Sequence, residues 1–153
     1  MSALDRVAVR VASDGDIDGV LLLDHVRERR DHIRGAINDG RCLVGQIGGE
    51  AVGFCVSGLF YGFDFLELLV VAESWRRRGI GRALVEAWED RAASPKVFTS
   101  TNQSNLPMQG LCESLGFVRS GIIENLDEGD PEIVYFKPNP HRTRLVTSGP
   151  TLD

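Results

Sequence analysis

Apolar and polar side chains follow two periods along the chain, one of two residues and one of between three and four. Residues 6–11 alternate between the two classes and predict a half-buried strand. The Ser13-x-x-Asp16 pattern is typical of a helix cap, and apolar positions at helical spacing follow it up to His25. Residues 63–72 are almost continuously apolar, which predicts a central strand covered on both faces.

The remaining elements follow from the same two patterns. Helices are predicted at residues 30–38, between Gly81 and Pro95, and at residues 105–115; strands are predicted at residues 41–47, 50–59, 96–101, 117–123 and 132–137. This order predicts a mixed α/β domain over residues 1–138, followed by a tail over residues 139–153 that has no periodicity.

The composition narrows the class of protein. The chain has 153 residues, 42% of them hydrophobic and 25% charged, which is typical of a globular domain and not of a disordered or fibrous chain. Apolar stretches such as residues 68–72 are too short to cross a membrane, and residues 1–5 lack the pattern of a secretory signal. We therefore expect a cytoplasmic protein, and the excess of arginine over lysine favours a bacterial one. The net charge of -5 argues against binding to duplex nucleic acid.

The sequence gives no metal-ligand pattern. The chain contains three cysteines, Cys42, Cys55 and Cys112. Their spacing and apolar contexts predict reduced thiols. Residues 14–19 resemble the opening of a calcium-binding loop, but His25 stands at the twelfth position, where a bidentate glutamate is required. The other histidines, His32 and His141, lie far apart in the sequence, so we expect no metal site.

Residues 70–84 carry the clearest chemical signal. A strand ends in a loop that contains Gly79 and Gly81 and passes directly into a helix. The amides at such a helix start lack helical partners, and glycine lets an anion approach them. Positive charge is added there by Arg76, Arg77, Arg78 and Arg82. The segment predicts a phosphate or pyrophosphate site; the alternative is a basic helix start in which the glycines serve packing alone.

The spacing of the motif discriminates between phosphate ligands. Leu84 stands where a dinucleotide-binding loop requires a third glycine, and the lysine of a nucleoside-triphosphate loop is missing. Arg76-x-x-Gly79-x-Gly81 resembles the [Gln/Arg]-x-x-Gly-x-[Gly/Ala] motif of the GNAT superfamily of acyl-CoA-dependent N-acetyltransferases.

A second motif extends this resemblance. Asn105-x-x-Met108-x-x-x-Cys112-x-x-x-Gly116-Phe117 is similar to the family's Asn-x-x-Ala-x-x-x-Tyr-x-x-x-Gly-Phe pattern, on a helix that leads into a strand. The resemblance covers nearly the whole chain except the tail. It implies the GNAT fold, a mixed and mostly antiparallel sheet of about seven strands flanked by about four helices. In that fold the fourth and fifth strands splay apart.

The resemblance also implies acetyl-CoA as the acyl donor. Backbone groups of Leu69, Val70 and Val71 would pair with its pantetheine arm. The backbone amides of residues 76–82, Ile80 among them, would hold its pyrophosphate. Asn105 would bind the pantetheine, cap its helix, or do both.

The implied reaction is direct attack of an amine on the thioester, which needs a proton acceptor, oxyanion donors and a donor for the leaving thiolate. Glu67 is the candidate base, since it is the only charge within residues 65–72; the alternative is that it binds the substrate ammonium or faces solvent. The amide of Val71 is the candidate oxyanion donor. Cys112 replaces the usual tyrosine and is the candidate acid, or else a packed residue. Tyr135 cannot be placed from the sequence.

The acceptor is left open as a small-molecule or peptide amine. Residues 124–132 contain five acidic side chains, which would attract a cationic amine or form a solvated hairpin tip. Polyamines, aminoglycosides, amino acids, lysine side chains and protein N-termini all fit, and so does transfer of a longer acyl chain. The alternative function is a non-catalytic acyl-CoA-binding sensor on the same fold. Exposed strand edges would allow a homodimer.

Overall fold

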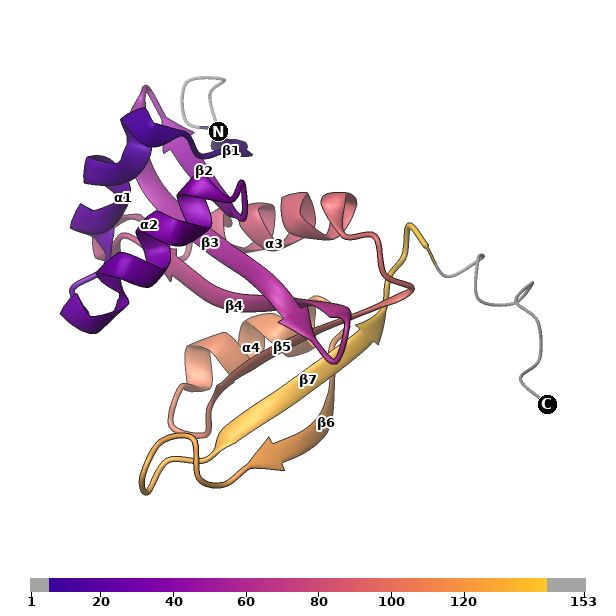
Figure 1. The fold of residues 1–153 in the computed structure, drawn as a ribbon. Helices are drawn as coiled ribbons and strands as arrows, with labels where there is room; N and C mark the ends of the chain where they lie inside the picture. The colour runs from indigo at the N-terminus through magenta and orange to yellow at the C-terminus, as the bar shows by residue number, and fades with distance from the viewer. Residues whose placement is uncertain (1–5, 143–153) are drawn as a thin grey trace. The chain divides into compact units, whose positions relative to one another are not determined.

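A computed structural model of the protein describes residues 6–142. The described chain forms two compact units, one made of residues up to Gly58 together with Glu67–Trp88, the other of Leu59–Leu66 together with the residues from Glu89 onward. The elements appear in chain order in Figure 1. The strands are β1 (Ala8–Val11), β2 (Cys42–Ile47), β3 (Glu50–Phe60), β4 (Phe63–Val71), β5 (Lys96–Asn102), β6 (Val118–Ile123) and β7 (Glu132–Pro138). The α-helices are α1 (Ile17–Leu23), α2 (Arg30–Asn38), α3 (Ile80–Arg91) and α4 (Leu106–Ser114), and short 3-10 helices cover Asp14–Asp16, Arg27–Arg29 and Glu73–Trp75.

The strand order is β1-β2-β3-β4-β5-β7-β6. The pairs β1–β2, β2–β3, β5–β7 and β6–β7 are antiparallel, whereas β4 and β5 are parallel through Phe65 with Phe98 and Leu66 with Thr99. The parallel pairing ends at Leu66, where β4 passes from the second unit into the first. The predicted GNAT fold with its mixed seven-stranded sheet is thereby confirmed.

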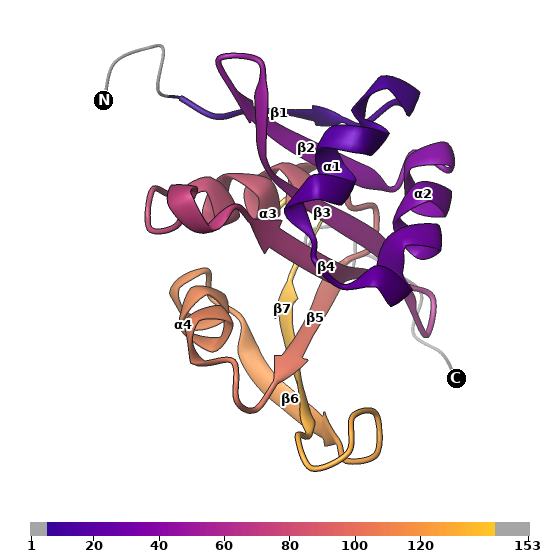
Figure 2. The same ribbon diagram turned by 90° about the vertical axis from the view of Figure 1, so that its left-hand side faces the viewer.

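The first unit has helices on both faces of its strands. In Figures 1 and 2, α1 and α2 cover one face of β2 and β3, and α3 covers the other. The core under α1 and α2 is apolar because both helices turn their aliphatic side chains to the strands. Its fully buried members include Val20, Ile33, Val44 and Phe54.

The opposite face accommodates α3 through a glycine. A β-bulge shifts the β2–β3 register, because Gly45 pairs with Gly53 whereas Gln46 pairs with Ala51. A Cβ atom on Gly53 would lie 3.1 Å from the side chain of Leu84 and 3.2 Å from that of Ile80. Both of these α3 residues are buried. Gly53 therefore lets the start of α3 pack closely on β3.

The second unit packs α4 with β5, β7 and β6. Its buried apolar side chains include Val97, Cys112, Phe117 and Ile133. A row of aromatic rings joins the strands, with centroids 5.5 Å apart for Phe60 and Phe98 and 6.0 Å apart for Phe98 and Phe136. Such rings fix the register of neighbouring strands through their packing.

Polar contacts close the second unit at the start of the predicted tail. Asn139 is fully buried, and its Nδ2 donates to the carbonyl groups of Ala92 and Ser94, each at 3.0 Å. His141 Nε2 lies 2.7 Å from Asp90 Oδ1. Residues 143–153 of the tail, and residues 1–5, lie outside the described residues.

Two local predictions need correction. The first helix ends at Leu23, so His25 lies beyond it; Asp24 is extended, and its Oδ1 accepts a hydrogen bond from Val26 N–H at 3.3 Å. The strand at residues 63–72 is not covered on both faces, because Leu66 alone is buried among residues 63–71. The physical reason is that its pairing with β5 ends at Leu66, which leaves the following apolar residues half-buried.

Among the described residues, no helix has both the length and the apolar character that a membrane span needs.

Candidate active site

The end of β4 presents backbone groups on its edge away from β3. Ala72 N–H donates to Val52 O on β3 at 2.8 Å. Val70 O also approaches β3, since it would lie 2.9 Å from a Cβ atom on Gly53. Because successive residues of a strand direct their backbone groups to opposite sides, Val71 and Leu69 direct theirs to the other edge. Arg76 Nε reaches Val71 O there, at 3.5 Å. Of the three predicted pantetheine-binding residues, Leu69 and Val71 thus have the suitable orientation, and Val70 has its carbonyl turned to β3.

The segment between β4 and α3 contains the 3-10 helix Glu73–Trp75 and ends in a tight turn. Arg77 has a φ of 64° and Gly79 a φ of 81°, so two residues adopt the left-handed conformation within three positions. Glycine adopts it without strain, whereas an arginine does so at a cost of about 1–2 kcal/mol. Strained backbone of this kind is concentrated at functional sites.

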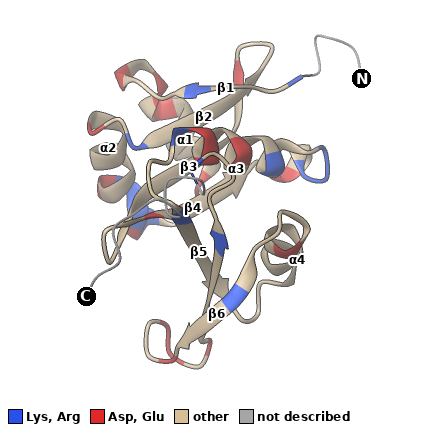
Figure 3. Cartoon of the chain, turned by 90° about the vertical axis from the view of Figure 1, so that its right-hand side faces the viewer, with Lys and Arg blue, Asp and Glu red and all other residues tan. Residues whose placement is uncertain are grey.

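The turn opens directly into the start of α3. The first helical hydrogen bond runs from Ala83 N–H to Gly79 O at 3.0 Å. The amides of Ile80 and Gly81 precede it, and the helix dipole adds partial positive charge at this end. Arg76, Arg77, Arg78 and Gly79 are all exposed, and Figure 3 shows the basic colour gathered at this turn. Arg82 pairs with Glu86 one turn along, at 3.6 Å. The geometry fits an anion that caps the helix.

A cavity of about 420 Å³ opens beside the same turn. It is lined by Arg6, Val7, Ile47, Trp75, Arg78, Gly79 and Ile80. The guanidinium of Arg78 lies over the ring of Trp75, 4.9 Å from its centroid. The cation–π contact holds one arginine of the turn at the rim of this cavity. Trp75 and Arg6 were not singled out by the sequence, since neither belongs to a motif.

The carboxylate of Glu67 occupies a place that a glycine leaves open. A Cβ atom on Gly58 of β3 would lie 2.8 Å from the carboxyl carbon of Glu67. Glu67 Oε2 lies 2.7 Å from His32 Nε2, and Glu67 Oε1 lies 4.0 Å from Arg41 Nη1. Three segments thus meet here: α2 with His32, the residue before β2 with Arg41, and β4 with Glu67. No sequence pattern could indicate His32 or Arg41, since 35 residues separate His32 from Glu67.

Arg41 is held in place independently of Glu67. Its Nη1 donates to Ser57 O at 2.5 Å, and its Nη2 lies 3.5 Å from Asp39 Oδ2. The carbonyl of Arg41 accepts from Ser57 N–H at 2.9 Å. The guanidinium is therefore a fixed positive charge beside Glu67.

In the second unit, Asn105 caps α4. Its Oδ1 accepts a hydrogen bond from Met108 N–H at 3.2 Å, which is the capping role that the sequence allowed. Gln109 of the same helix is buried, with its Nε2 donating to Gln103 O at 2.6 Å and to Asn102 O at 3.2 Å. These bonds tie the first turn of α4 to the end of β5.

Cys112 lies in α4 with only 2% of its surface exposed. Burial raises the pKa of its thiol to about 12. Cys42 and Cys55 are likewise buried free thiols.

The acidic loop between β6 and β7 is held by hydrogen bonds. Asp127 Oδ2 accepts from Asn102 Nδ2 at 2.8 Å, and Asp130 Oδ2 accepts from Ser104 Oγ at 2.6 Å. Glu132 accepts from Ser100 Oγ at 2.6 Å. Three of its carboxylates therefore stabilise the loop itself, which leaves fewer of them to attract a cationic substrate.

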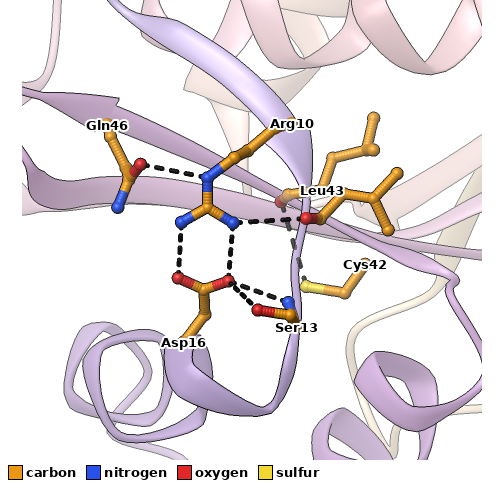
Figure 4. A network of polar contacts seen from close by, with 7 residues as sticks. Arg10, Ser13, Asp16, Cys42, Leu43 and Gln46 are labelled. Carbon is orange, nitrogen blue, oxygen red and sulfur yellow. Dashed lines mark hydrogen bonds and ion pairs between the residues drawn. The ribbon is translucent and has the colours of Figure 1, made fainter.

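One aspartate of the segment that resembles a calcium loop, Asp16, has another partner. Arg10 forms a bidentate ion pair with Asp16, with both N–O distances at 2.7 Å (Figure 4). Asp16 Oδ2 also accepts from Ser13 N–H at 2.8 Å, which confirms the predicted cap. The hydrogen bonds from Arg10 and Ser13 hold the pKa of the Asp16 carboxyl well below its usual range. This carboxylate is thus engaged in an internal structural contact.

The sequence matches a known family over most of its length. The family model described as the acetyltransferase (GNAT) family matches residues 16–117. Among curated protein sequences, none matches the chain significantly.

Solved structures match at the level of the whole fold. A GNAT-family acetyltransferase from Bacillus cereus ATCC 10987 is 36% identical, with a TM-score of 0.83 over 88% of this chain and 98% of its own. The ribosomal-protein-S18-alanine N-acetyltransferase of Escherichia coli is 19% identical, with a TM-score of 0.73 over 88% of this chain and 94% of its own. A Bacillus anthracis protein assigned as a streptothricin acetyltransferase, in complex with acetyl coenzyme A, is 19% identical, with a TM-score of 0.56 over 63% and 61% of the two chains.

Proposed function

The chain belongs to the GNAT family of acetyltransferases, and we propose that it transfers the acetyl group of acetyl-CoA to a primary amine of a small molecule or peptide. One observation carries the proposal: an exposed, basic glycine turn caps α3 directly beside the outward-facing edge of β4. A diphosphate suits the turn, and an amide-bearing arm such as pantetheine suits the strand edge. Acetyl-CoA contains both groups in one molecule.

The cofactor-binding residues of the proposal fall into two groups. Leu69 and Val71 would pair with the arm through their backbone groups, with Val70 between them. The turn from Arg76 to Arg82 would hold the diphosphate, through the amides of Gly79, Ile80 and Gly81 and the charges of the neighbouring arginines.

The acceptor must lose a proton before it reacts. An alkyl ammonium with a pKa near 10.4 is neutral in only about 0.04% of molecules at pH 7, a handicap of roughly 4–5 kcal/mol. We assign the removal of this proton to the site that contains the Glu67 carboxylate. The neutral amine then attacks the thioester carbonyl, and the N–H of Val71 would stabilise the resulting oxyanion.

The leaving thiolate needs a proton in turn. A buried thiol whose pKa is raised to about 12 is a poor donor, so the geometry favours the packing role for Cys112. The proton that the attacking nitrogen loses as the amide forms is sufficient to protonate the sulfur.

The named relatives define the range of acceptors to test. The Escherichia coli enzyme is named for a protein alanine and the Bacillus anthracis protein for the antibiotic streptothricin. Both belong to the same fold as this chain, so peptide N-termini and amine-bearing small molecules are the first candidates.

The proposal is tested by following the release of CoA thiol from acetyl-CoA with a panel of amines and peptides, against reactions without an acceptor. Binding of CoA is measured in parallel by calorimetry. Turnover of at least one amine is expected, with the product mass increased by one acetyl group. Binding without turnover on any acceptor would favour a sensor, and absence of CoA binding would overturn the proposal.

A variant that lacks the arginine charges tests the contribution of the turn to CoA binding. Replacing Arg76, Arg77 and Arg78 together with glutamine is expected to weaken CoA binding by on the order of tenfold or more and to reduce its salt dependence. The matched control replaces three other exposed arginines, Arg27, Arg30 and Arg34, and should leave CoA binding unchanged.

A further inference from the structure

His32 and Glu67 form a hydrogen-bonded pair from two separate elements. Nε2 of the imidazole lies 2.7 Å from Oε2 of the carboxylate, within the range of a charge-assisted hydrogen bond. An ionised carboxylate can only accept hydrogen bonds, so Nε2 carries the hydrogen and Nδ1 of the neutral ring is left as an acceptor. This is the arrangement in which a carboxylate orients an imidazole for proton transfer.

The surroundings already occupy part of the Glu67 carboxylate. Its Oε2 is bonded to His32, its Oε1 faces Arg41 Nη1 at 4.0 Å, and its carboxyl carbon lies against Gly58. An incoming ammonium would compete with these groups for the carboxylate. The carboxylate side chain is 29% exposed, whereas the imidazole is 53% exposed. The imidazole is thus the more accessible of the two groups.

The position of His32 is fixed by the helix that carries it. His32 lies in the first turn of α2, and the next residue, Ile33, is fully buried in the core under that helix. Glu67 lies on β4, and its neighbour in the sequence, Leu66, is buried. The helix and the strand therefore hold the backbones of both residues in regular secondary structure.

Charged groups of the described residues lie on both sides of the pair. Arg41 faces the far side of Glu67, and Asp39 pairs with Arg41. On α2 itself, Asp31 is the neighbour of His32 in the sequence. Among the contacts of the described residues, Glu67 is the group that contacts the imidazole and can stabilise a positive charge on it.

We propose that His32 is the proton acceptor of the transfer reaction and that Glu67 is its positioning residue. The inference rests on the proposed acetyltransferase function and deepens it. Nδ1 of His32 takes one proton from the acceptor ammonium, which gives a neutral amine and an imidazolium that keeps its Nε2–H bond to Glu67. The amine nitrogen forms a bond to the acetyl carbon, and the carbon–sulfur bond then breaks. The second nitrogen proton passes to the sulfur, and His32 releases the first proton to solvent.

This assignment can be tested kinetically with an acceptor that the panel of amines and peptides identifies. Glutamine at position 32 keeps an N–H donor at the place of Nε2 but cannot accept a proton from an amine. His32→Gln and His32→Ala are both expected to lose kcat by on the order of 10²- to 10⁴-fold, with the KM for acetyl-CoA unchanged. The pH dependence that the imidazole gives to kcat/KM should disappear in both variants. His32→Gln with wild-type kcat and pH profile would overturn the proposal, because Glu67 would then act directly.

A matched control is provided by the second histidine–carboxylate pair. His141 Nε2 lies 2.7 Å from Asp90 Oδ1, the same distance as in the first pair. His141→Gln should leave kcat and its pH profile unchanged. A similar loss in this variant would show that the effect is structural, and it would overturn the assignment of His32.

The pair can also be tested without any turnover, which separates its failure from that of the proposed function. Long-range proton–nitrogen correlation spectra of the wild-type protein are expected to show His32 as the Nε2–H tautomer, and Glu67→Gln is expected to change its nitrogen shifts. Unchanged shifts in Glu67→Gln would show that the two groups do not interact in solution, and the proposal would fail even if the protein acetylates amines.

Discussion

Glu67 of β4 lies beside Gly58 of β3, and the carboxyl carbon of Glu67 would be 2.8 Å from a Cβ atom at residue 58. A side chain of any size at residue 58 would therefore displace the carboxylate from His32. The absence of a side chain at residue 58 is thus part of the construction of the candidate active site.

Gly58→Ala is expected to lower kcat on the order of tenfold or more while the protein remains folded, because the added methyl group displaces the carboxylate and not the backbone. Steady-state kinetics and thermal unfolding measure the two effects separately. Gly15→Ala is the control, since a Cβ atom there meets nothing within 4 Å. An alanine variant at position 58 with normal kcat would show that the place of Glu67 does not matter.

Gly79→Ala tests the turn before α3. The φ of 81° at Gly79 strains an alanine by about 1–2 kcal/mol, so the turn should change shape and CoA should bind more weakly. Gly62→Ala is a matched control, because Gly62 has a φ of 82° in the β3–β4 turn. Both variants should lose similar stability, but only Gly79→Ala should lose affinity in calorimetry. Equal affinities in the two variants would contradict a role of the turn in binding.

The Arg10–Asp16 pair predicts a loss of stability in acid. The pKa of Asp16 in the folded protein lies well below its ordinary value near 3.9, so its contribution is present above about pH 4. The contribution is lost as the pH falls from there toward the folded pKa. Asp16→Asn should lower the free energy of unfolding by about 1–2 kcal/mol at pH 7 and by less at pH 3, measured with urea. Asp14→Asn, which changes an exposed neighbour, should have little effect at either pH.

The three thiols should be protected in the folded protein. Burial raises the pKa values of Cys42, Cys55 and Cys112 to about 12 each. On the order of one thiol in 10⁴ to 10⁵ is then ionised at pH 7.5, and the thiolate is the reactive form. Labelling with a thiol reagent should follow the unfolding curve in urea. Rapid labelling of one cysteine in the native protein would show that its site opens locally.

The sequence was sufficient to predict the helices and strands of the sheet and their order along the chain. The predicted bounds of α2, residues 30–38, agree with the structure, because a strong apolar period ends at Gly40, which has a φ of 74°. The glycine turn at residues 79–81 was equally visible, since a turn is encoded by consecutive residues. The fold class followed from these local patterns, and the resemblance of two motifs to those of a known family indicated the family.

Contacts across the sheet could not be predicted in this way. The half-exposed state of β4 depends on where its pairing with β5 ends, and the acidic loop is engaged by Asn102 and Ser104, which lie far from it in the sequence. The sequence placed a lone carboxylate at residue 67 and a scattered histidine at residue 32, without any relation between them.

By itself, the sequence determined the periodicities, the caps, the glycine turn and the charges on it, because each of these is a property of neighbouring residues. Only the tertiary structure decided that Glu67 meets His32 over Gly58, and that Cys112 is buried. Such pairings depend on how strands and helices pack, and packing joins residues whose distance along the chain carries no signal.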